Sequence, residues 1–311
     1  MNPKALFLVL AALGSSCTSF APPFSEPLEP QRIVAFADVH GDFDATLRAL
    51  RLAGAIDESR HWIGGDLIVV QTGDQLDRGD GEQEILELFE QLAVEAAEAG
   101  GEFHSLLGNH ELMNVAWDFR YVTPGGFEDF EGATRADLEA PEFASLTQDK
   151  RARAAAFQPG GRYALALAEH DVILVLGDSV FVHGGVLPKH VEYGIDKIND
   201  QTKQWLLGNI DQPDVLRGPD SPIWARTYSL DPDEAAAITL RETLDSLGVK
   251  RMVMGHTIQE GGIRVLCEGD AWCLDVGMAS HYGGPIEVLE ILGDQVTVLR
   301  EAVVPSAATP K

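Results

Sequence analysis

The stretch Gly73-Asp74-Gln75-Leu76-Asp77-Arg78-Gly79 organises the interpretation of the whole chain. It follows Leu67-Ile68-Val69-Val70, a short apolar run rich in β-branched residues, which predicts a buried strand. The acids and the arginine therefore lie on a loop at the C-terminal end of a strand, where open α/β sheets place their ligand sites. Asp74 is placed there to hold a metal ion, and Arg78 to hold an anion. For this heptad alone, the alternative is a polar turn with a surface salt bridge.

The composition of the 311-residue chain is that of a folded, acidic protein. Hydrophobic residues make up 45% of it, which is enough for a sizeable core. The 49 acidic residues against 23 basic ones give a net charge of −26, which would repel the phosphates of nucleic acids and anionic membranes. We therefore expect no nucleic-acid partner. A small phosphorylated substrate is not excluded, because it meets the local field of its site rather than the net charge.

Residues 1–16 have the pattern of a secretory signal. Lys4 is their only charge, residues 5–13 are an apolar run, and Gly14-Ser15-Ser16 precede Cys17. The run is too short to span a membrane comfortably, so we predict a signal peptide and export to the bacterial periplasm or envelope. The small residues before Cys17 also resemble a bacterial lipoprotein cleavage site, which would attach a lipid to Cys17 and anchor the protein in a membrane.

The segments and cysteines outside the motifs lead to three smaller predictions. Repeated prolines predict an extended tether over residues 17–30, and residues 304–311 are predicted to be a flexible tail. Besides Cys17, the chain contains only Cys267 and Cys273. An oxidising compartment favours a disulfide between them. The alternative is a metal-binding cysteine pair, which lacks a nearby histidine.

Residues 31–303 are predicted to form one domain of class α/β (α+β). Helical periodicity predicts helices at 45–52, 82–99 and 162–170. Because βα units come first and mostly strands follow, we expect a central sandwich of two mixed β-sheets flanked by helices. Residues 112–160 are predicted to be a mainly helical insertion that covers the site and shapes substrate choice. The predicted strands lie at 33–36, 67–70, 103–107, 172–176, 180–182, 251–254, 263–267, 271–275, 286–291 and 296–303.

Several predicted strands end in oxygen or nitrogen donors. A single histidine at the end of a strand usually has a structural role, but donors at several strand ends together indicate a metal centre. Imidazole and carboxylate ligands without a thiolate suit Mn, Fe or Zn. Two metal ions would need a bridging group, and Asp74, midway in the set, is the natural bridge. The predicted metal ligands are Asp38, His40, Asp74, Asn109, His183 and His256.

The motifs that carry these donors resemble, in order, those of the phosphoprotein phosphatase branch of the calcineurin-like metallophosphoesterases. They are Asp38-x-His40, Gly73-Asp74-x-x-Asp77-Arg78-Gly79, Gly108-Asn109-His110-Glu111, His183-Gly184-Gly185 and Gly255-His256-Thr257. Within that branch the chain is similar to the Shewanella-like protein phosphatases. The finer likeness rests on 73–79 together with His110-Glu111-Leu112-Met113-Asn114-Val115, Gln158-Pro159-Gly160-Gly161-Arg162 and Pro222-Ile223-Trp224-Ala225-Arg226.

The resemblance implies a calcineurin-like architecture and a role for each matching residue. Asp38, His40 and Asp74 would bind one metal ion, and Asp74, Asn109, His183 and His256 the other. His110 would protonate the leaving oxygen, with Asp77 holding its ring. Arg78 and Arg226 would bind the phosphoryl oxygens. A metal-bridging hydroxide would attack phosphorus directly and in line, without a phosphoenzyme.

The function expected from the resemblance is that of a two-metal phosphomonoesterase, a protein phosphatase acting on phosphotyrosine or on phosphoserine and phosphothreonine. One alternative is a dinucleoside polyphosphate hydrolase or phosphodiesterase, which shares the early motifs. The other is a non-catalytic metal-binding protein of the envelope. The sequence leaves the native metal, the oligomeric state and the physiological substrate open.

Further residues near the motifs have secondary expectations. Glu111 is expected to brace its loop, and Asp42 and Asp44 to cap the following helix rather than to bind metal. Asp275-Val276-Gly277-Met278 lacks the tyrosine-bearing loop of the eukaryotic Ser/Thr enzymes that the branch includes. His281 and Tyr282, slightly further on, are weak candidates for approaching the site.

Overall fold

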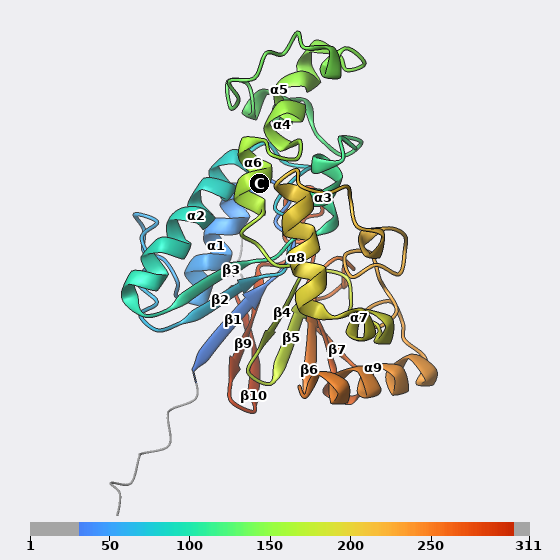
Figure 1. The fold of residues 1–311 in the computed structure, drawn as a ribbon. Coiled ribbons are helices and arrows are strands. Elements are labelled where there is room, and N and C mark those ends of the chain that lie inside the picture. The colour runs from blue at the N-terminus through green and yellow to red at the C-terminus, as the bar shows by residue number, and fades with distance from the viewer. Residues whose placement is uncertain (1–30, 302–311) are drawn as a thin grey trace, which may run out of the picture. The chain divides into compact units, whose positions relative to one another are not determined.

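Ten strands form two five-stranded sheets in residues 31–301, the part of the chain that the computed structural model describes (Figure 1). The predictions for the signal peptide, the Cys17 lipid, the tether and the tail lie outside these residues. The first sheet has the order β10-β9-β1-β2-β3, with β1 Arg32–Phe36, β2 Ile68–Gln71, β3 Glu102–Ser105, β9 Glu287–Leu292 and β10 Gln295–Arg300. The second has the order β4-β5-β6-β8-β7, with β4 Ile173–Leu176, β5 Ser179–Val182, β6 Arg251–Met254, β7 Arg264–Leu266 and β8 Ala271–Cys273.

Each sheet has three neighbouring parallel strands and antiparallel strands at its margin. In the first sheet β1, β2 and β3 run parallel, with Ile33 opposite Ile68 and Ile68 opposite Glu102. In the second sheet β5, β6 and β8 run parallel. The antiparallel pairs are β1 with β9, β9 with β10, β4 with β5, and β7 with β8. The predicted pair of mixed sheets is therefore confirmed, and each parallel set brings three carboxyl ends to one edge.

Alternation along the strands divides the core between the two faces of the second sheet. Phe181 of β5 and Val253 of β6 pack in a cluster with residues of β1 and β2 from the first sheet. Their neighbours Val180 and Val182 pack in another cluster, with Leu167 and Trp205 from the flanking helices. Because successive side chains of a strand point to opposite faces, the single strand β5 contributes side chains to both apolar clusters.

The flanking helices cover the outer faces of the sheets in Figure 1. Helices α1 Phe43–Ala53 and α2 Glu82–Ala99 lie beside the first sheet, and α7 Pro188–Tyr193, α8 Ile195–Leu206 and α9 Glu234–Leu247 lie towards the second. Asp42 caps α1 as expected, because its side chain accepts a hydrogen bond from the Ala45 amide. The remaining helices are α3 Asn109–Val115, α4 Pro124–Asp129, α5 Gln148–Phe157 and α6 Arg162–Leu167.

The predicted bounds and apolar face of helix α2 are confirmed. One of its acidic residues, however, is buried rather than exposed to solvent as expected. Ile85, Phe89 and Leu92 are buried. Glu82, in the first turn, is also fully buried. A helical pattern predicts which face is apolar, but it does not reveal that a distant arginine neutralises an acid at the helix start.

Residues 112–160 contain the end of α3, then α4, α5 and the short 3₁₀ helix Pro141–Phe143. Figure 1 shows α4 and α5 beyond one end of the sheets. This segment has its own small apolar cluster, which includes Phe119, Phe127 and Phe143.

The predicted disulfide between Cys267 and Cys273 is not present, because both cysteines are free. In the hairpin of β7 and β8, Cys273 lies opposite Arg264 and Leu266 lies opposite Ala271. Cys267 therefore belongs to the turn, and the antiparallel register holds it away from Cys273 along the strand direction.

None of the helices within residues 31–301 combines the length and the apolar composition that crossing a membrane requires.

Candidate metal centre

All six strands of the two parallel sets deliver side chains to one region, just beyond their carboxyl ends. A cavity of about 360 Å³ lies there, and its lining includes eight of the ten predicted site residues. The other two, Asp77 and His183, are fully buried behind the lining and contact it. The predicted residues in the lining are Asp38, His40, Asp74, Arg78, Asn109, His110, Arg226 and His256.

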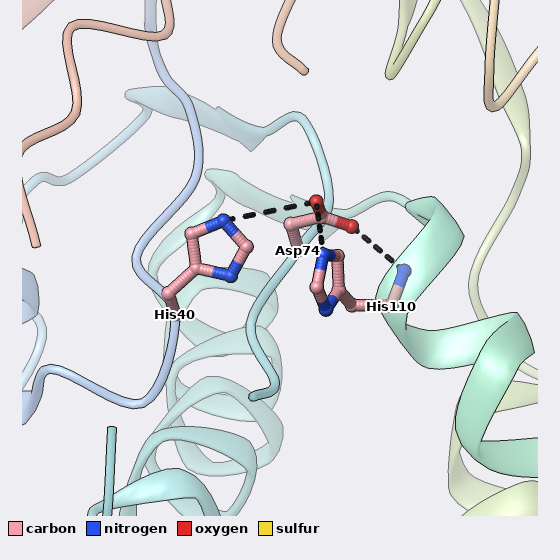
Figure 2. A group of neighbouring side chains, drawn as sticks. All are labelled: His40, Asp74 and His110. Carbon is pink, nitrogen blue, oxygen red and sulfur yellow. Dashed lines mark hydrogen bonds and ion pairs between the residues drawn. The ribbon is translucent and has the colours of Figure 1, made fainter. Parts of the chain in front are cut away.

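Asp74 is shared by two groups of potential metal ligands, one on each side of it. His40, Asp74 and His110 form the first group, and Asp74, His183 and His256 the second, each with ligand atoms within 4.8 Å of one another. Figure 2 shows the first group, with both imidazole rings directed at the Asp74 carboxylate. Within it, Asp74 Oδ2 lies 3.9 Å from His40 Nε2 and 3.7 Å from His110 Nε2.

Hydrogen bonds to backbone carbonyls orient two of the histidines. His40 Nδ1 lies 3.0 Å from the Leu76 carbonyl, and His183 Nδ1 lies 3.0 Å from the Thr72 carbonyl. A carbonyl only accepts, so each Nδ1 carries the proton, and Nε2 is the nitrogen presented to the site. His40 Nε2 also lies 3.9 Å from Asp38 Oδ2, which places Asp38 beside the first group as predicted.

The second group has the donor set that a cation requires. Asp74 Oδ2 lies 3.2 Å and Asn109 Oδ1 3.0 Å from His183 Nε2, so three different donors converge. His256 Nε2 is buried and has no hydrogen-bond partner among the described residues. A buried imidazole nitrogen without a partner is costly unless something absent from the chain itself binds it. Both groups therefore fit metal ions with oxygen and nitrogen ligands, as the sequence predicts.

The pKa values of the buried histidines follow their neighbours. Burial lowers the pKa of His40 to about 4. Burial, helped by the charges of His183 and Arg226, lowers that of His256 to about 2. Burial also disfavours the charged form of His183, but Asp74 and Asp38 outweigh it and raise its pKa to about 10. His40 and His256 thus present neutral imidazoles, the form that binds metals, while His183 lies in a field that favours positive charge.

Three carboxylates near these histidines are also buried, and their pKa values depend on the same contacts. Burial disfavours the charged form of Asp74, but His183, His110 and His40 outweigh it and hold its pKa well below its usual range. Burial and the nearby Asp275 raise the pKa of Asp38. Burial raises the pKa of Asp275 to about 6. Carboxylates that raise each other's pKa in a dry site are stabilised when cations are bound between them.

The loops that hold these ligands are strained. His40, Asp74 and His256 all have positive φ, between 43° and 66°, and so do Asp77 and Arg78, at 68° and 69°. Residues other than glycine adopt this conformation at a cost, which is found mainly at functional sites. Gly73 permits the close approach of two such loops, since a Cβ there would lie 2.6 Å from the Gly108 amide nitrogen.

Glu111 braces the loop as expected. Its fully buried carboxylate accepts hydrogen bonds from the amides of Asp74 and Gly108, at 2.9 and 2.7 Å. It also accepts from Gln75 and Leu76, at 2.8 and 3.2 Å. One side chain thus satisfies four amides and ties the 73–79 loop to the start of α3.

His110 is held by Asp77 on the side away from Asp74. His110 Nδ1 lies 2.6 Å from Asp77 Oδ2, and the His110 amide donates to Asp74 Oδ1 at 2.9 Å. Burial lowers the pKa of His110, but Asp74 and the hydrogen bond with Asp77 outweigh it, and the pKa is raised. His110 therefore retains a proton more readily than a free histidine, with Nε2 towards the cavity.

Arg78 and Arg226 both line the cavity. The Arg78 guanidinium lies over the rings of Tyr121 and Tyr282, at 4.6 and 5.2 Å from their centroids. Arg226 Nη1 donates to the carbonyl of His256 and to Thr257 Oγ1, at 3.1 and 2.9 Å. Aromatic and polar contacts hold each side chain in the lining.

Sequence reasoning missed several residues of the site. Asp275 follows β8 as the other donors follow their strands, and this position was the available signal. Tyr282, a weak candidate, does line the cavity, with its ring centroid 5.6 Å from that of His40. Tyr121 and Trp224 also line the cavity, and no local pattern marks Tyr121.

Comparisons with known proteins agree with a phosphoesterase centre. The family described as calcineurin-like phosphoesterase matches residues 31–150. Shewanella-like protein phosphatase 2 of Arabidopsis thaliana is 40% identical over 298 residues, which cover 86% of this chain and 76% of the relative. A cold-active protein tyrosine phosphatase structure is 26% identical with a TM-score of 0.70, covering 86% of this chain and 76% of its own. Another such structure, from a psychrophilic Shewanella species, is 26% identical with a TM-score of 0.69, covering 87% and 81%.

The fold and the site thus define a metallophosphoesterase, a hydrolase that acts on phosphate esters. Within that class, this chain belongs to the calcineurin-like metallophosphoesterases as a homologue of the Shewanella-like protein phosphatases. The resemblance inferred from the motifs is confirmed.

Proposed function

We propose that this protein is a two-metal-dependent protein phosphatase that acts on phosphorylated side chains, with phosphotyrosine preferred. The observation that carries the proposal is that two groups of potential metal ligands share Asp74 and meet at one cavity. A shared carboxylate between two sets of nitrogen and oxygen donors suits a two-metal centre.

The ligand sets follow from the contacts around Asp74. Asp38, His40 and Asp74 would hold one ion, and Asp74 with Asn109, His183 and His256 the other. Mn, Fe or Zn suits these donors. When bound, the ions would supply an activated water for direct in-line attack on phosphorus and would neutralise the phosphoryl oxygens.

The protein's own groups would bind the substrate and deliver a proton. Arg78 and Arg226 lie in the cavity lining, where their guanidinium groups can hold two phosphoryl oxygens. His110 presents Nε2 to the cavity while Asp77 holds Nδ1 at 2.6 Å. The proton on Nε2 would pass to the leaving oxygen, and Asp77 would stabilise the orientation of the ring throughout.

The wall of the cavity supports a preference for an aromatic substrate side chain. Tyr121, Trp224 and Tyr282 line it together with Ile258 and Leu230. Aromatic and aliphatic groups around a phosphate site favour a phosphorylated ring over a short polar side chain, because the ring buries apolar area. The two structural relatives described above are cold-active protein tyrosine phosphatases, which is consistent with this preference.

The test is hydrolysis of four substrates by protein stripped of metal and then refilled with manganese. The substrates are p-nitrophenyl phosphate, a phosphotyrosine peptide, a phosphoserine peptide and a dinucleoside tetraphosphate. We expect turnover of the first two, slower turnover of phosphoserine and none in the stripped protein. Turnover of the nucleotide alone would replace the proposal with a dinucleoside polyphosphate hydrolase. Metal binding without turnover of any of the four would mean a binding protein.

We also propose that the protein is exported and held in the envelope by a lipid on Cys17, which the sequence of residues 1–17 supports. Fractionation of bacterial cells that express the full chain should place the protein with the membranes. The Cys17→Ala variant should move to the periplasmic fraction or keep its signal peptide. Wild-type protein in the cytoplasm with an intact N-terminus would contradict export.

A further inference from the structure

Arg153 of α5 is a fully buried arginine that reaches from the 112–160 segment to the residues behind the metal centre. Its Nη1 donates to Glu82 Oε2 and, at 2.8 Å, to the Gly126 carbonyl. Its Nη2 donates to Glu82 Oε1 at 2.9 Å and to Asp77 Oδ1 at 3.3 Å. Its Nε donates to Asn114 Oδ1 at 2.7 Å. All three guanidinium nitrogens are therefore used.

These contacts surround Asp77, the partner of His110. Asp77 Oδ2 lies on His110 Nδ1, whereas Oδ1 accepts from Arg153 and, at 3.0 Å, from Asn114 Nδ2. The Asp77 amide donates to Glu82 Oε1. Arg153 thus holds Asp77 both directly and through Glu82 and Asn114.

Burying these three charged side chains costs free energy of folding, and a contact that served only stability would not need charged groups. Arg153, Asp77 and Glu82 are all fully buried, and Asp77 has a φ of 68°. Buried ion pairs often contribute little net stability compared with apolar residues of similar volume. The planar fork of Arg153 is held by the two carboxylate oxygens of Glu82, and its Nη2 also donates to Asp77 Oδ1 at 3.3 Å. Together with Asn114 Nδ2 on the same oxygen, this contact fixes the direction of Oδ2. Phe130 and Phe157 pack on the guanidinium, with ring centroids at 4.7 and 5.2 Å.

We propose that Arg153 is a positioning residue for proton donation: it fixes Asp77, and through Asp77 it directs His110 Nε2 at the leaving oxygen. Arg153 is absent from the cavity lining, so it acts without touching the substrate. Through it, the packing of α5 controls the acid step. This inference rests on the proposed role of His110 as general acid.

The diagnostic measurement is the dependence of kcat on the leaving group. Proton donation matters little for p-nitrophenolate, a weak base, and much for phenolate. We expect Arg153→Met to lower kcat for phenyl phosphate by about 10-fold or more, as outer-shell partners commonly do. For p-nitrophenyl phosphate we expect a change of less than about threefold, with KM nearly unchanged for both. Arg153→Lys should fall between Arg153→Met and wild type, because it retains the charge but loses the fork.

Arg151→Met is the matched control, since Arg151 lies on the same helix and bonds to Glu139 and the carbonyls of Leu138 and Leu146. It should leave both rates unchanged. Because Arg153→Met leaves Glu82 buried without its partner, the double variant Glu82→Gln, Arg153→Met is measured beside it. Gln retains an acceptor for the Asp77 amide and removes the unpaired charge. Folding of each variant is checked by circular dichroism.

Measurements in the His110→Asn background distinguish a failure of the positioning role of Arg153 from a failure of the general-acid role of His110. If Arg153 acts through His110, adding Arg153→Met to His110→Asn should cause no further loss on phenyl phosphate. Equal losses on both substrates in every folded Arg153 variant, or a full additional loss in the His110→Asn background, would overturn the positioning role. If His110→Asn lowered kcat equally for phenyl phosphate and p-nitrophenyl phosphate, the general-acid role in the proposed function would fail instead.

Discussion

Asp74→Asn is expected to lower the rate of phosphate ester hydrolysis by at least about 1,000-fold. Asp74 Oδ2 lies within 4 Å of ring nitrogens of His40, His110 and His183, and no other residue belongs to both ligand groups. An amide in its place removes a negative charge and one of the two oxygens that would hold the ions. The several kcal/mol that metal ions contribute to the transition state would be lost, at about 1.36 kcal/mol for each factor of ten. Steady-state kinetics with p-nitrophenyl phosphate and metal analysis of the purified variant would measure both effects.

Asp44→Asn is the control for this experiment. Asp44 lies in the first turn of α1, close to the first motif, and its side chain is 79% exposed. It should retain wild-type activity and wild-type metal content. An Asp74→Asn variant with normal activity would contradict the two-metal centre, whereas an inactive variant with both ions bound would place the defect in chemistry rather than in binding.

His110→Asn should lower kcat by about 100- to 10,000-fold for a phosphoserine peptide, the range typical of general acid catalysis. His110 Nε2 faces the cavity, and Asn at this position carries no proton that it can donate. The loss should be smaller for a phosphotyrosine peptide and smallest for p-nitrophenyl phosphate, because the leaving oxygen becomes less basic along this series. Rates at saturating substrate, with metal content measured in parallel, would show the trend.

His104→Asn is the matched control for His110→Asn. His104 lies on β3, pairs with Glu102 at 2.6 Å and is not part of the cavity lining. It should leave the rates unchanged. Intact hydrolysis of the phosphoserine peptide by His110→Asn would show that the proton comes from another group or from solvent. A loss accompanied by missing metal would instead assign His110 to the first ligand group.

The placement of the candidate metal ligands was predictable because it depends on local rules. Apolar runs such as 67–70 end where polar loops begin, and parallel strands bring their carboxyl ends to one edge. Asp38, Asp74, Asn109, His183 and His256 follow β1, β2, β3, β5 and β6, and the structure brings all of them together. Asp275 follows β8 by the same rule, and attention to that strand end would have found it.

The errors have a different origin. The Cys267–Cys273 pairing assumed that a short separation in sequence brings two side chains together, whereas strand register decides which residues are opposite each other. Glu82 and Arg153 are 71 positions apart, and each alone resembles an exposed residue on a helix. Only the packing of α5 against the start of α2 shows that both are buried and neutralise each other.

The order of strands and motifs therefore predicted the class of fold, the types of candidate ligand and a candidate acid at His110, because each motif is a short local pattern at the end of a strand. The tertiary structure decided which distant side chains meet: Tyr282 beside His40, and Arg153 behind Asp77. It also decided the protonation preferences, since burial and neighbouring charges lower the pKa of His256 while raising that of His183. Electrostatic and packing interactions act across space, so they become defined only when the two sheets bring their strand ends to a common edge.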